Sequence, residues 1–291
     1  MVIEGAFTAI VTPMRDGEVD YDALSRLCEE QIDAGIDGLV PVGTTGESAT
    51  LSVPEHVEVI KHTIKAAAGR VPVIAGAGGN STREAIVLSK ESEKAGAEGL
   101  LHVAPYYNKP TQEGLYQHFK AIAESTELPI VLYNVPGRTS SDIQNDTVLR
   151  LSDIDNIVAI KDATADMRRA GDLLRRVDPS FAVLSGDDFT ALTLWALGGR
   201  GCISVISNAM PDRMAKMWDA VCSNDWDAAR KLHYSMLPLC ELLFAEGNPI
   251  GIKETMHILG KITPELRLPM TRASESLQQR LRDCLSAEGM L

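Results

Sequence analysis

Residues 129–136 read Pro-Ile-Val-Leu-Tyr-Asn-Val-Pro, a short apolar run between two prolines. An apolar run with few polar interruptions is typical of a strand that is covered on both faces. Seven further runs of this kind occur, and a longer segment of helical periodicity follows each one. They lie at 6–13, 38–43, 72–78, 99–105, 157–163, 182–188 and 201–208.

The segments between the runs carry helix start and stop signals. Ser52 with Glu55, and Ser81 with Glu84, have the spacing of capping boxes at helix N-termini. Three glycines stand where helices are expected to end: Gly35, Gly69 and Gly96.

The runs begin 19 to 34 residues apart, close to the ~30 residues of a βαβ unit. Eight such units predict the α/β class and a (β/α)8 or TIM barrel, with a doubly wound open sheet as the structural alternative. After residue 208 only helices are expected, at 210–224, 225–246, 250–260 and 271–291. We therefore expect a barrel over residues 1–224 and a helical C-terminal extension over 225–291.

Composition excludes several classes of protein. The 291 residues include 28 basic and 40 acidic side chains, a net charge of −12, and no basic stripe of the kind that binds nucleic acid. Five widely spaced cysteines argue against a disulfide framework or a structural zinc site. Neither a basic leader nor an apolar stretch of ~18 residues is present, so we expect a cytoplasmic protein without a membrane span.

Catalytic groups of such barrels lie at the C-terminal ends of the strands. Near the end of the run 157–163, alternation places Ala159, Lys161 and Ala163 on one face. Desolvation lowers the pKa of a lysine, and the neutral amine can form a Schiff base with a carbonyl compound. The alternative is a lysine that reaches solvent or pairs with a carboxylate such as Asp162.

Other strand ends also carry polar groups. Tyr133 could transfer protons in the barrel mouth, or simply pack there. The turn 43–47, Gly-Thr-Thr-Gly-Glu, offers backbone N–H groups and hydroxyls to a carboxylate. Arg138 could hold a carboxylate in a bidentate manner, or lie on the surface. Asp187 and Asp188 lack partners at ligand spacing, so we expect no metal site.

Three motifs taken together are recognisable: the turn 43–47, Tyr-Asn-Val-Pro-Gly-Arg-Thr at 133–139, and Ile-Lys-Asp at 160–162. In this order the chain resembles the dihydrodipicolinate synthases over essentially its whole length. The first and third motifs mark a wider superfamily of pyruvate-dependent lyases, whereas Arg138 and the run 106–108 are more specific. The resemblance implies condensation of pyruvate with L-aspartate 4-semialdehyde to 4-hydroxy-tetrahydrodipicolinate, on the diaminopimelate route to L-lysine. It also implies that no organic cofactor is needed.

The resemblance also implies roles for residues. Lys161 forms the Schiff base, and a proton relay comprises Tyr133, Thr44 and Tyr107, the last reaching across a dimer interface. Thr45 contacts the pyruvate carboxylate, Arg138 binds the semialdehyde carboxylate, and Gly186 and Ile203 line the pocket.

Members of the family are often inhibited by L-lysine, and the resemblance implies a site for it at the dimer interface of a dimer of dimers. The matching residues are Ser48, Ala49, His56, Asn80, Glu84 and Tyr106. Val53 departs from a histidine often found there. Glu84 could instead be engaged in the helix cap with Ser81.

Three other functions stay open at this point. A Schiff-base aldolase for sugar acids would not need Arg138, because its substrate has no matching carboxylate. A non-catalytic keto-acid sensor would not need a proton relay. A metal-dependent aldolase would lose its activity in the presence of a chelator.

Overall fold

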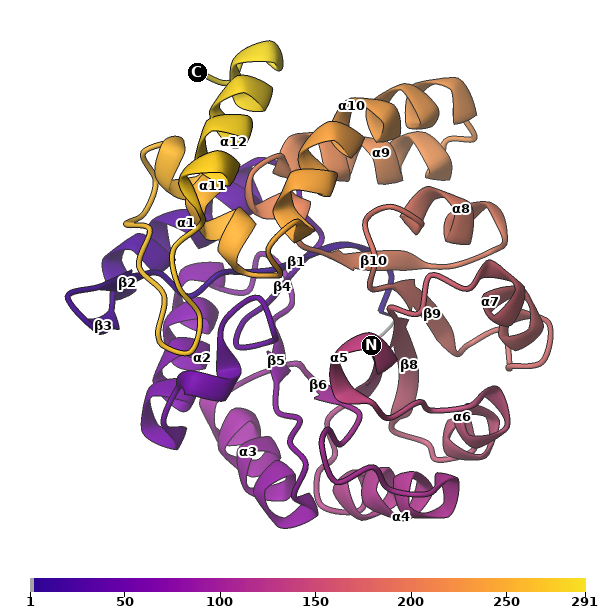
Figure 1. Cartoon of the computed structure of the whole chain (residues 1–291). Helices are drawn as coiled ribbons and strands as arrows, with labels where there is room; N and C mark the ends of the chain where they lie inside the picture. The colour runs from indigo at the N-terminus through magenta and orange to yellow at the C-terminus, as the bar shows by residue number, and fades with distance from the viewer. Residues whose placement is uncertain (1–2) are drawn as a thin grey trace.

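The computed structural model describes residues 3–291, and its centre is an eight-stranded parallel barrel (Figure 1). The hydrogen-bonded order is β4-β1-β10-β9-β8-β7-β6-β5, and a parallel bridge between Leu39 and Val73 joins the two outer strands. The predicted TIM barrel is thus confirmed, and the alternative of an open sheet is wrong. Its strands are β1 (Gly5–Ala9), β4 (Gly38–Val40), β5 (Ile74–Gly76), β6 (Gly99–Val103), β7 (Ile130–Asn134), β8 (Ile157–Asp162), β9 (Ala182–Ser185) and β10 (Gly201–Ser204).

Each strand ends before its apolar run does. The residues left over at the end of each run form the turns that lead into the helices, and these turns make one end of the barrel. A small hairpin of β2 (Met14–Arg15) and β3 (Glu18–Val19) was not predicted.

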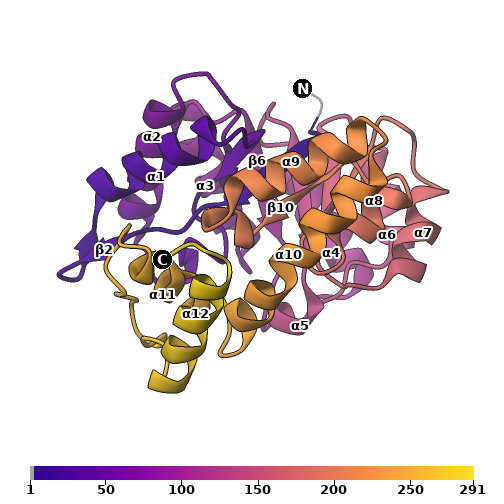
Figure 2. The ribbon, with the colours of Figure 1, turned by 90° about the horizontal axis from the view of Figure 1, so that it is seen from above.

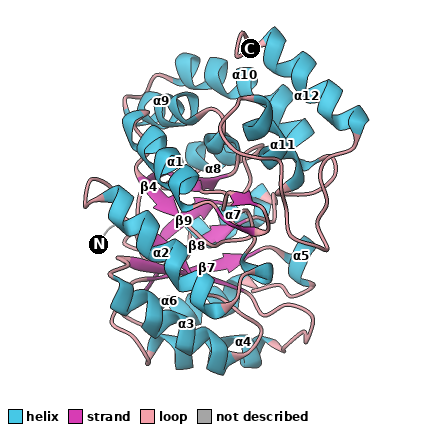
Figure 3. Cartoon of the chain, turned by 90° about the vertical axis from the view of Figure 1, so that its left-hand side faces the viewer, coloured by secondary structure: helices cyan, strands magenta, loops and turns pink. Residues whose placement is uncertain are grey.

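Helices surround the barrel (Figure 3). They are α1 (Tyr21–Asp33), α2 (Val53–Ala67), α3 (Thr82–Ala95), α4 (Gln112–Ala123), α6 (Asn145–Ser152), α7 (Met167–Leu174), α8 (Ala191–Ala196) and α9 (Pro211–Cys222). Short turns of helix, not predicted, occur at η1 (Ser48–Thr50), α5 (Pro136–Thr139) and η2 (Ile206–Asn208). Gly35 and Gly96 end α1 and α3 with φ of 91° and 95°, a left-handed conformation that glycine adopts without strain.

The two capping boxes differ. Ser52 and Glu55 form the complete reciprocal pair predicted for α2. At α3 the Ser81 hydroxyl accepts from the Glu84 backbone N–H, but the Glu84 side chain does not return to the cap. The second box was therefore half wrong, and the Glu84 carboxylate is free for another role.

Two apolar clusters hold the fold together. The barrel interior contains, among others, Phe7, Val131, Ala159, Leu184 and Ile203. A larger cluster lies between the strands and the helices around them. Alternating side chains of each strand feed the two clusters, so every barrel strand is covered on both faces, as the uninterrupted apolar runs indicated.

The chain ends with α10 (Trp226–Phe244), α11 (Ile250–Ile258) and α12 (Glu275–Ala287). Leu239, Ile252 and Leu281 of these helices belong to the same apolar cluster as the outer barrel. The boundary predicted between 224 and 225 falls in the turn between α9 and α10, and the apolar core continues across it. Helices α11 and α12 lie toward the same end of the barrel as α5 (Figures 2 and 3).

No helix within residues 3–291 has the length and apolar character needed to cross a membrane.

Candidate active site

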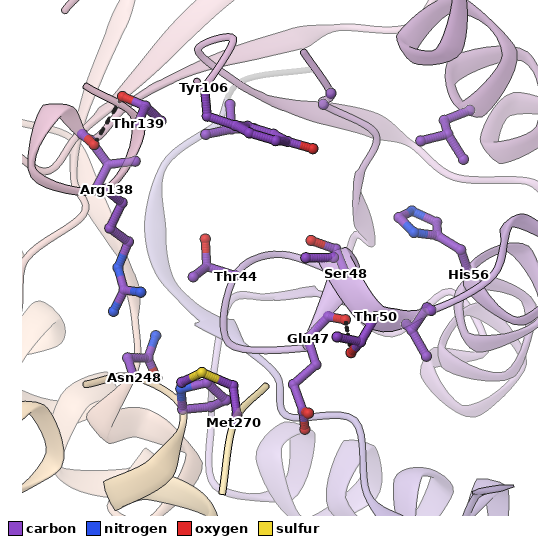
Figure 4. A pocket seen from close by; sticks show the side chains of 18 of the residues that line it. Thr44, Glu47, Ser48, Thr50, His56, Tyr106, Arg138, Thr139, Asn248 and Met270 are labelled. Atoms are coloured by element: carbon purple, nitrogen blue, oxygen red, sulfur yellow. Dashed lines mark hydrogen bonds between the residues drawn. The ribbon is translucent and has the colours of Figure 1, made fainter. Parts of the chain in front are cut away.

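A cleft of about 410 Å³ opens at the end of the barrel where the turns lie (Figure 4). It runs from Thr44, Arg138 and Asn248 to His56 and Tyr106. A smaller cavity of about 30 Å³ adjoins it, and Gly43, Thr44, Ser48 and Tyr133 are among its lining residues. The volume of the larger cleft is in the range of small-molecule sites.

Lys161 lies on β8 directly beside Tyr133 of β7, since these two residues are register partners. It is only 5% exposed, and its Nζ lies 4.3 Å from the centroid of the Tyr133 ring. Within residues 3–291 its amine makes no hydrogen bond and no salt bridge, and Asp162 instead accepts from the Thr164 backbone N–H at 2.8 Å. Both alternatives for Lys161, a solvent-exposed amine and a pair with Asp162, were therefore wrong.

Gly186, at the end of β9, provides the space for the Lys161 side chain. A Cβ at this position would lie 2.9 Å from Lys161 Cε and 2.9 Å from the Ala163 Cβ. Such contacts are shorter than ordinary van der Waals distances. Ile203 of β10 is buried in the barrel interior, in the same apolar cluster as Tyr133. Gly186 is thus next to the lysine, whereas neither Gly186 nor Ile203 is among the residues that line the two cavities.

The structure does not bring all the predicted relay residues together. Tyr133 and Thr44 line the same small cavity. Tyr107, in contrast, is 88% exposed with a left-handed φ of 73°, and it lines neither cavity. Its side chain is therefore separate from the others within one chain.

The turn 43–47, the predicted carboxylate cradle, is closed by hydrogen bonds of its own backbone. Gly46 and Glu47 donate their backbone N–H groups to Gly43 and Thr44 within the turn. In the part of the chain that the structure describes, the backbone N–H groups of Thr44 and Thr45 have no acceptor. Neighbouring N–H groups without acceptors are the kind of donor that binds an anion.

Arg138 lies in the short helix α5, with its side chain exposed and lining the cleft. Figure 4 shows its guanidinium pointing toward Asn248. No carboxylate among residues 3–291 pairs with it. An unpaired guanidinium at a cleft mouth can bind an anionic group in a bidentate manner.

The other end of the cleft gathers the residues predicted to bind lysine. Ser48, Ala49, His56, Glu84 and Tyr106 line it, and Asn80 supports it by donating to the Tyr106 carbonyl at 3.2 Å. The His56 ring contacts the Gly76 carbonyl at 2.6 Å, and burial lowers the pKa of His56. Burial, with the nearby Glu84 carboxylate, raises the pKa of Tyr106.

Asp187 and Asp188 have structural partners. Asp188 accepts from the backbone N–H groups of Val205 and Ile206, and Asp187 accepts from the Thr190 hydroxyl. No group of three or more potential metal ligands occurs in the described range 3–291.

Sequence reasoning missed Asn248, Lys253 and Glu254. Lys253 is fully buried and pairs with Glu47, at the end of the cradle, while Asn248 contacts Thr45. Glu254 is also buried and binds Arg272 through both carboxylate oxygens. Two charged residues in succession in a largely apolar helix, α11, were the signal available.

Comparison with known proteins identifies the family of the chain. The sequence matches the Dihydrodipicolinate synthetase family over residues 2–288. It is 50% identical to 4-hydroxy-tetrahydrodipicolinate synthase of Laribacter hongkongensis (strain HLHK9) over the full length of both chains.

Solved structures show the same likeness. The chloride-inhibited dihydrodipicolinate synthase of Acinetobacter baumannii, complexed with pyruvate, is 49% identical with a TM-score of 0.97, covering 99% of this chain and 100% of that one. DHDPS from Cyanidioschyzon merolae, solved with lysine bound, is 40% identical with a TM-score of 0.95, covering 99% of each chain. Sequence and fold thus agree, and the chain belongs to the dihydrodipicolinate synthetase family.

Proposed function

We propose that Lys161 is the Schiff-base nucleophile of this protein, which is a lyase of the class I aldolase type. The protein condenses pyruvate with L-aspartate 4-semialdehyde to give 4-hydroxy-tetrahydrodipicolinate, in the diaminopimelate route to lysine. The observation that carries the proposal is the buried, unpaired amine of Lys161, held beside Tyr133 in the space that Gly186 leaves open.

The amine attacks the keto carbon of pyruvate, and loss of water gives the iminium. This cation accepts the electron pair when a methyl proton leaves, and the resulting enamine attacks the aldehyde carbon of the second substrate. The amino group of that substrate then displaces Lys161 from the imine carbon and closes the ring. The iminium is the electron sink, so these steps require no metal ion or organic cofactor.

Protons must be supplied and removed at several of these steps. Tyr133 and Thr44 line one small cavity next to the lysine and are placed to exchange protons there. We propose that Tyr107 of a second copy completes the relay, because this exposed tyrosine cannot join the others within its own chain. A dimer is the smallest assembly that satisfies this, and we propose a dimer of dimers acting in the cytoplasm.

Two carboxylates are bound in this scheme. The turn at Thr44 and Thr45 holds the carboxylate of pyruvate, while Arg138 at the cleft mouth holds that of the semialdehyde. The unpaired guanidinium favours this reaction over an aldolase for sugar acids, whose acceptor has no carboxylate there. The presence of both Tyr133 and Thr44 on one small cavity favours catalysis over a keto-acid sensor.

We propose L-lysine as an inhibitor that binds at the far end of the cleft. In this proposal Glu84, whose side chain does not return to the helix cap, binds the ammonium group, and Ser48, Ala49, His56, Asn80 and Tyr106 complete the site. Millimolar lysine should inhibit the wild type, and Glu84→Gln should weaken this inhibition at unchanged uninhibited activity. Activity unaffected by lysine would reject the site.

Borohydride trapping tests the central proposal. The protein is incubated with pyruvate, reduced with borohydride and weighed intact by mass spectrometry, with Lys161→Ala in parallel. We expect one covalent adduct per chain in the wild type and none in the variant. A folded wild type without an adduct would refute the Schiff-base mechanism.

A further inference from the structure

A series of buried polar contacts joins the turn 43–47 to the C-terminal extension. The Asn248 side-chain N–H donates to the Thr45 Oγ1 at 2.9 Å. Lys253 Nζ donates to Glu47 Oε1 at 2.5 Å and to the Thr12 carbonyl at 3.0 Å. The other Glu47 oxygen accepts from the Arg267 backbone N–H at 3.1 Å. The turn 43–47 thus contacts segments that lie about 200 residues further along the chain.

The turn needs such support because its backbone is strained. Val42 and Glu47, on either side of the glycine-threonine segment, have φ of 51° and 57°. A β-branched residue rarely adopts this left-handed conformation, and it persists only where surrounding contacts hold it. The Glu47 side chain points away from Thr44 (Figure 4), and its partner Lys253 is completely buried. The extension thus holds one end of the turn.

The contact between Asn248 and Thr45 also has a direction. An amide N–H can only donate, so the Thr45 oxygen accepts in this bond. The hydroxyl proton of Thr45 is then left for another acceptor. Thr45 is 2% exposed, which leaves few orientations open to that proton.

We infer that Asn248 is a positioning residue that turns the Thr45 hydroxyl proton toward the carboxylate of pyruvate. The inference rests on the proposed function, in which Thr45 contacts this carboxylate. It assigns to the C-terminal extension a part in substrate binding at the barrel. Asn248 acts through Thr45 in this role.

The test is a double-mutant cycle read by borohydride trapping. The adduct fraction is measured against pyruvate concentration for the wild type, Asn248→Ala, Thr45→Val and the double variant, and the half-saturating concentration is compared. Each single variant should raise this concentration about tenfold to hundredfold, the range expected for one hydrogen bond to a charged group. The double variant should match Thr45→Val alone, since without the hydroxyl there is nothing left to orient.

Two controls separate orientation from packing. In a Thr45→Ser background the hydroxyl is retained, so Asn248→Ala should again raise the half-saturating concentration. Asn156→Ala removes amide hydrogen bonds to the Ala123 and Thr126 carbonyls near the start of β8, and should leave pyruvate binding unchanged. If Asn248→Ala does not fold, Asn248→Asp replaces it. A carboxylate there takes the Thr45 proton, so the half-saturating concentration should rise at least as much.

The outcomes distinguish failure of the proposed function from failure of the role inferred for Asn248. A wild type without an adduct refutes the proposed function, and the inference with it. A wild type that forms the adduct, with Asn248→Ala binding pyruvate equally well, refutes the inference alone. The inference is also refuted if the fold-increase in half-saturating pyruvate concentration of the double variant equals the product of the two single increases. Such a result would show that Asn248 acts independently of the Thr45 hydroxyl.

Discussion

Replacing Gly186 by alanine places a methyl carbon 2.9 Å from Lys161 Cε and 3.0 Å from Lys161 Cγ. The backbone there has no left-handed φ, so the substitution acts through this contact rather than through backbone strain. Ordinary contact begins at 3.4 Å, so the new methyl group must separate by about 0.5 Å from Lys161 and also from the Ala163 Cβ, which lies 2.9 Å away. Because a misplacement of ~1 Å can cost about a hundredfold in rate, we expect roughly tenfold slower Schiff-base formation.

The assay is the rate of borohydride-trapped adduct formation at saturating pyruvate, with thermal unfolding measured in parallel. Gly171→Ala is the matched control, since a Cβ at this position in α7 meets nothing within 4 Å. We expect the control to keep the wild-type rate and to be more stable by about 0.5–1 kcal/mol. A wild-type rate in folded Gly186→Ala would show that the lysine does not depend on this space.

Three further predictions concern the mouth, the cradle and the core. Arg138→Ala should raise the half-saturating concentration of the semialdehyde about tenfold or more, with Arg138→Lys intermediate; an equal loss of pyruvate adduct would contradict its assigned role. Lys253→Met leaves the Glu47 carboxylate buried and unpaired, so the free energy of unfolding should fall by about 3–5 kcal/mol in urea titrations, against at most ~1 kcal/mol for the exposed pair of Lys216 and Asp212. Burial lowers the pKa of His102 to about 3, so this ring is neutral in the folded protein but protonates near pH 6.5 when unfolded. The contribution of neutral His102 to the free energy of unfolding is therefore complete above pH 6.5 and is lost as the pH falls toward 3, at about 1.4 kcal/mol per pH unit. In urea titrations from pH 7 to 5, the free energy of unfolding of His102→Asn should fall less steeply with pH than that of the wild type.

Much of the site was predictable because a strand end is a local feature. Lys161 and Tyr133 each lie near the end of an apolar run, and alternation groups each with the residues on one face of its strand. The turn 43–47 was recognisable for the same reason, since its glycines and threonines directly follow a strand. The capping serine before α3 was also found, but the direction of the Glu84 side chain was not. That direction depends on the cleft, which the local pattern does not describe.

Other parts of the site depend on residues far apart in the chain. Gly186 and Lys161 face each other only because β8 and β9 are neighbours with a given register. Asn248 and Thr45 are 203 positions apart, and no local pattern connects them. The proposed role of Tyr107 in the proton relay requires a second chain, and neither the local sequence pattern nor the structure of a single chain shows that contact.

The sequence by itself determined the eight main strand and helix segments, because periodicity of apolar residues is read over a few neighbouring positions, whereas barrel closure over an open sheet came from the strand pairing. Its motifs also identified the lysine and the family. Tertiary structure alone decided that the Lys161 amine is unpaired, that Gly186 makes room for it, and that the extension holds the cradle through Lys253 and Asn248. These features follow from barrel closure and helix docking, which bring side chains together across distances that local periodicity cannot specify.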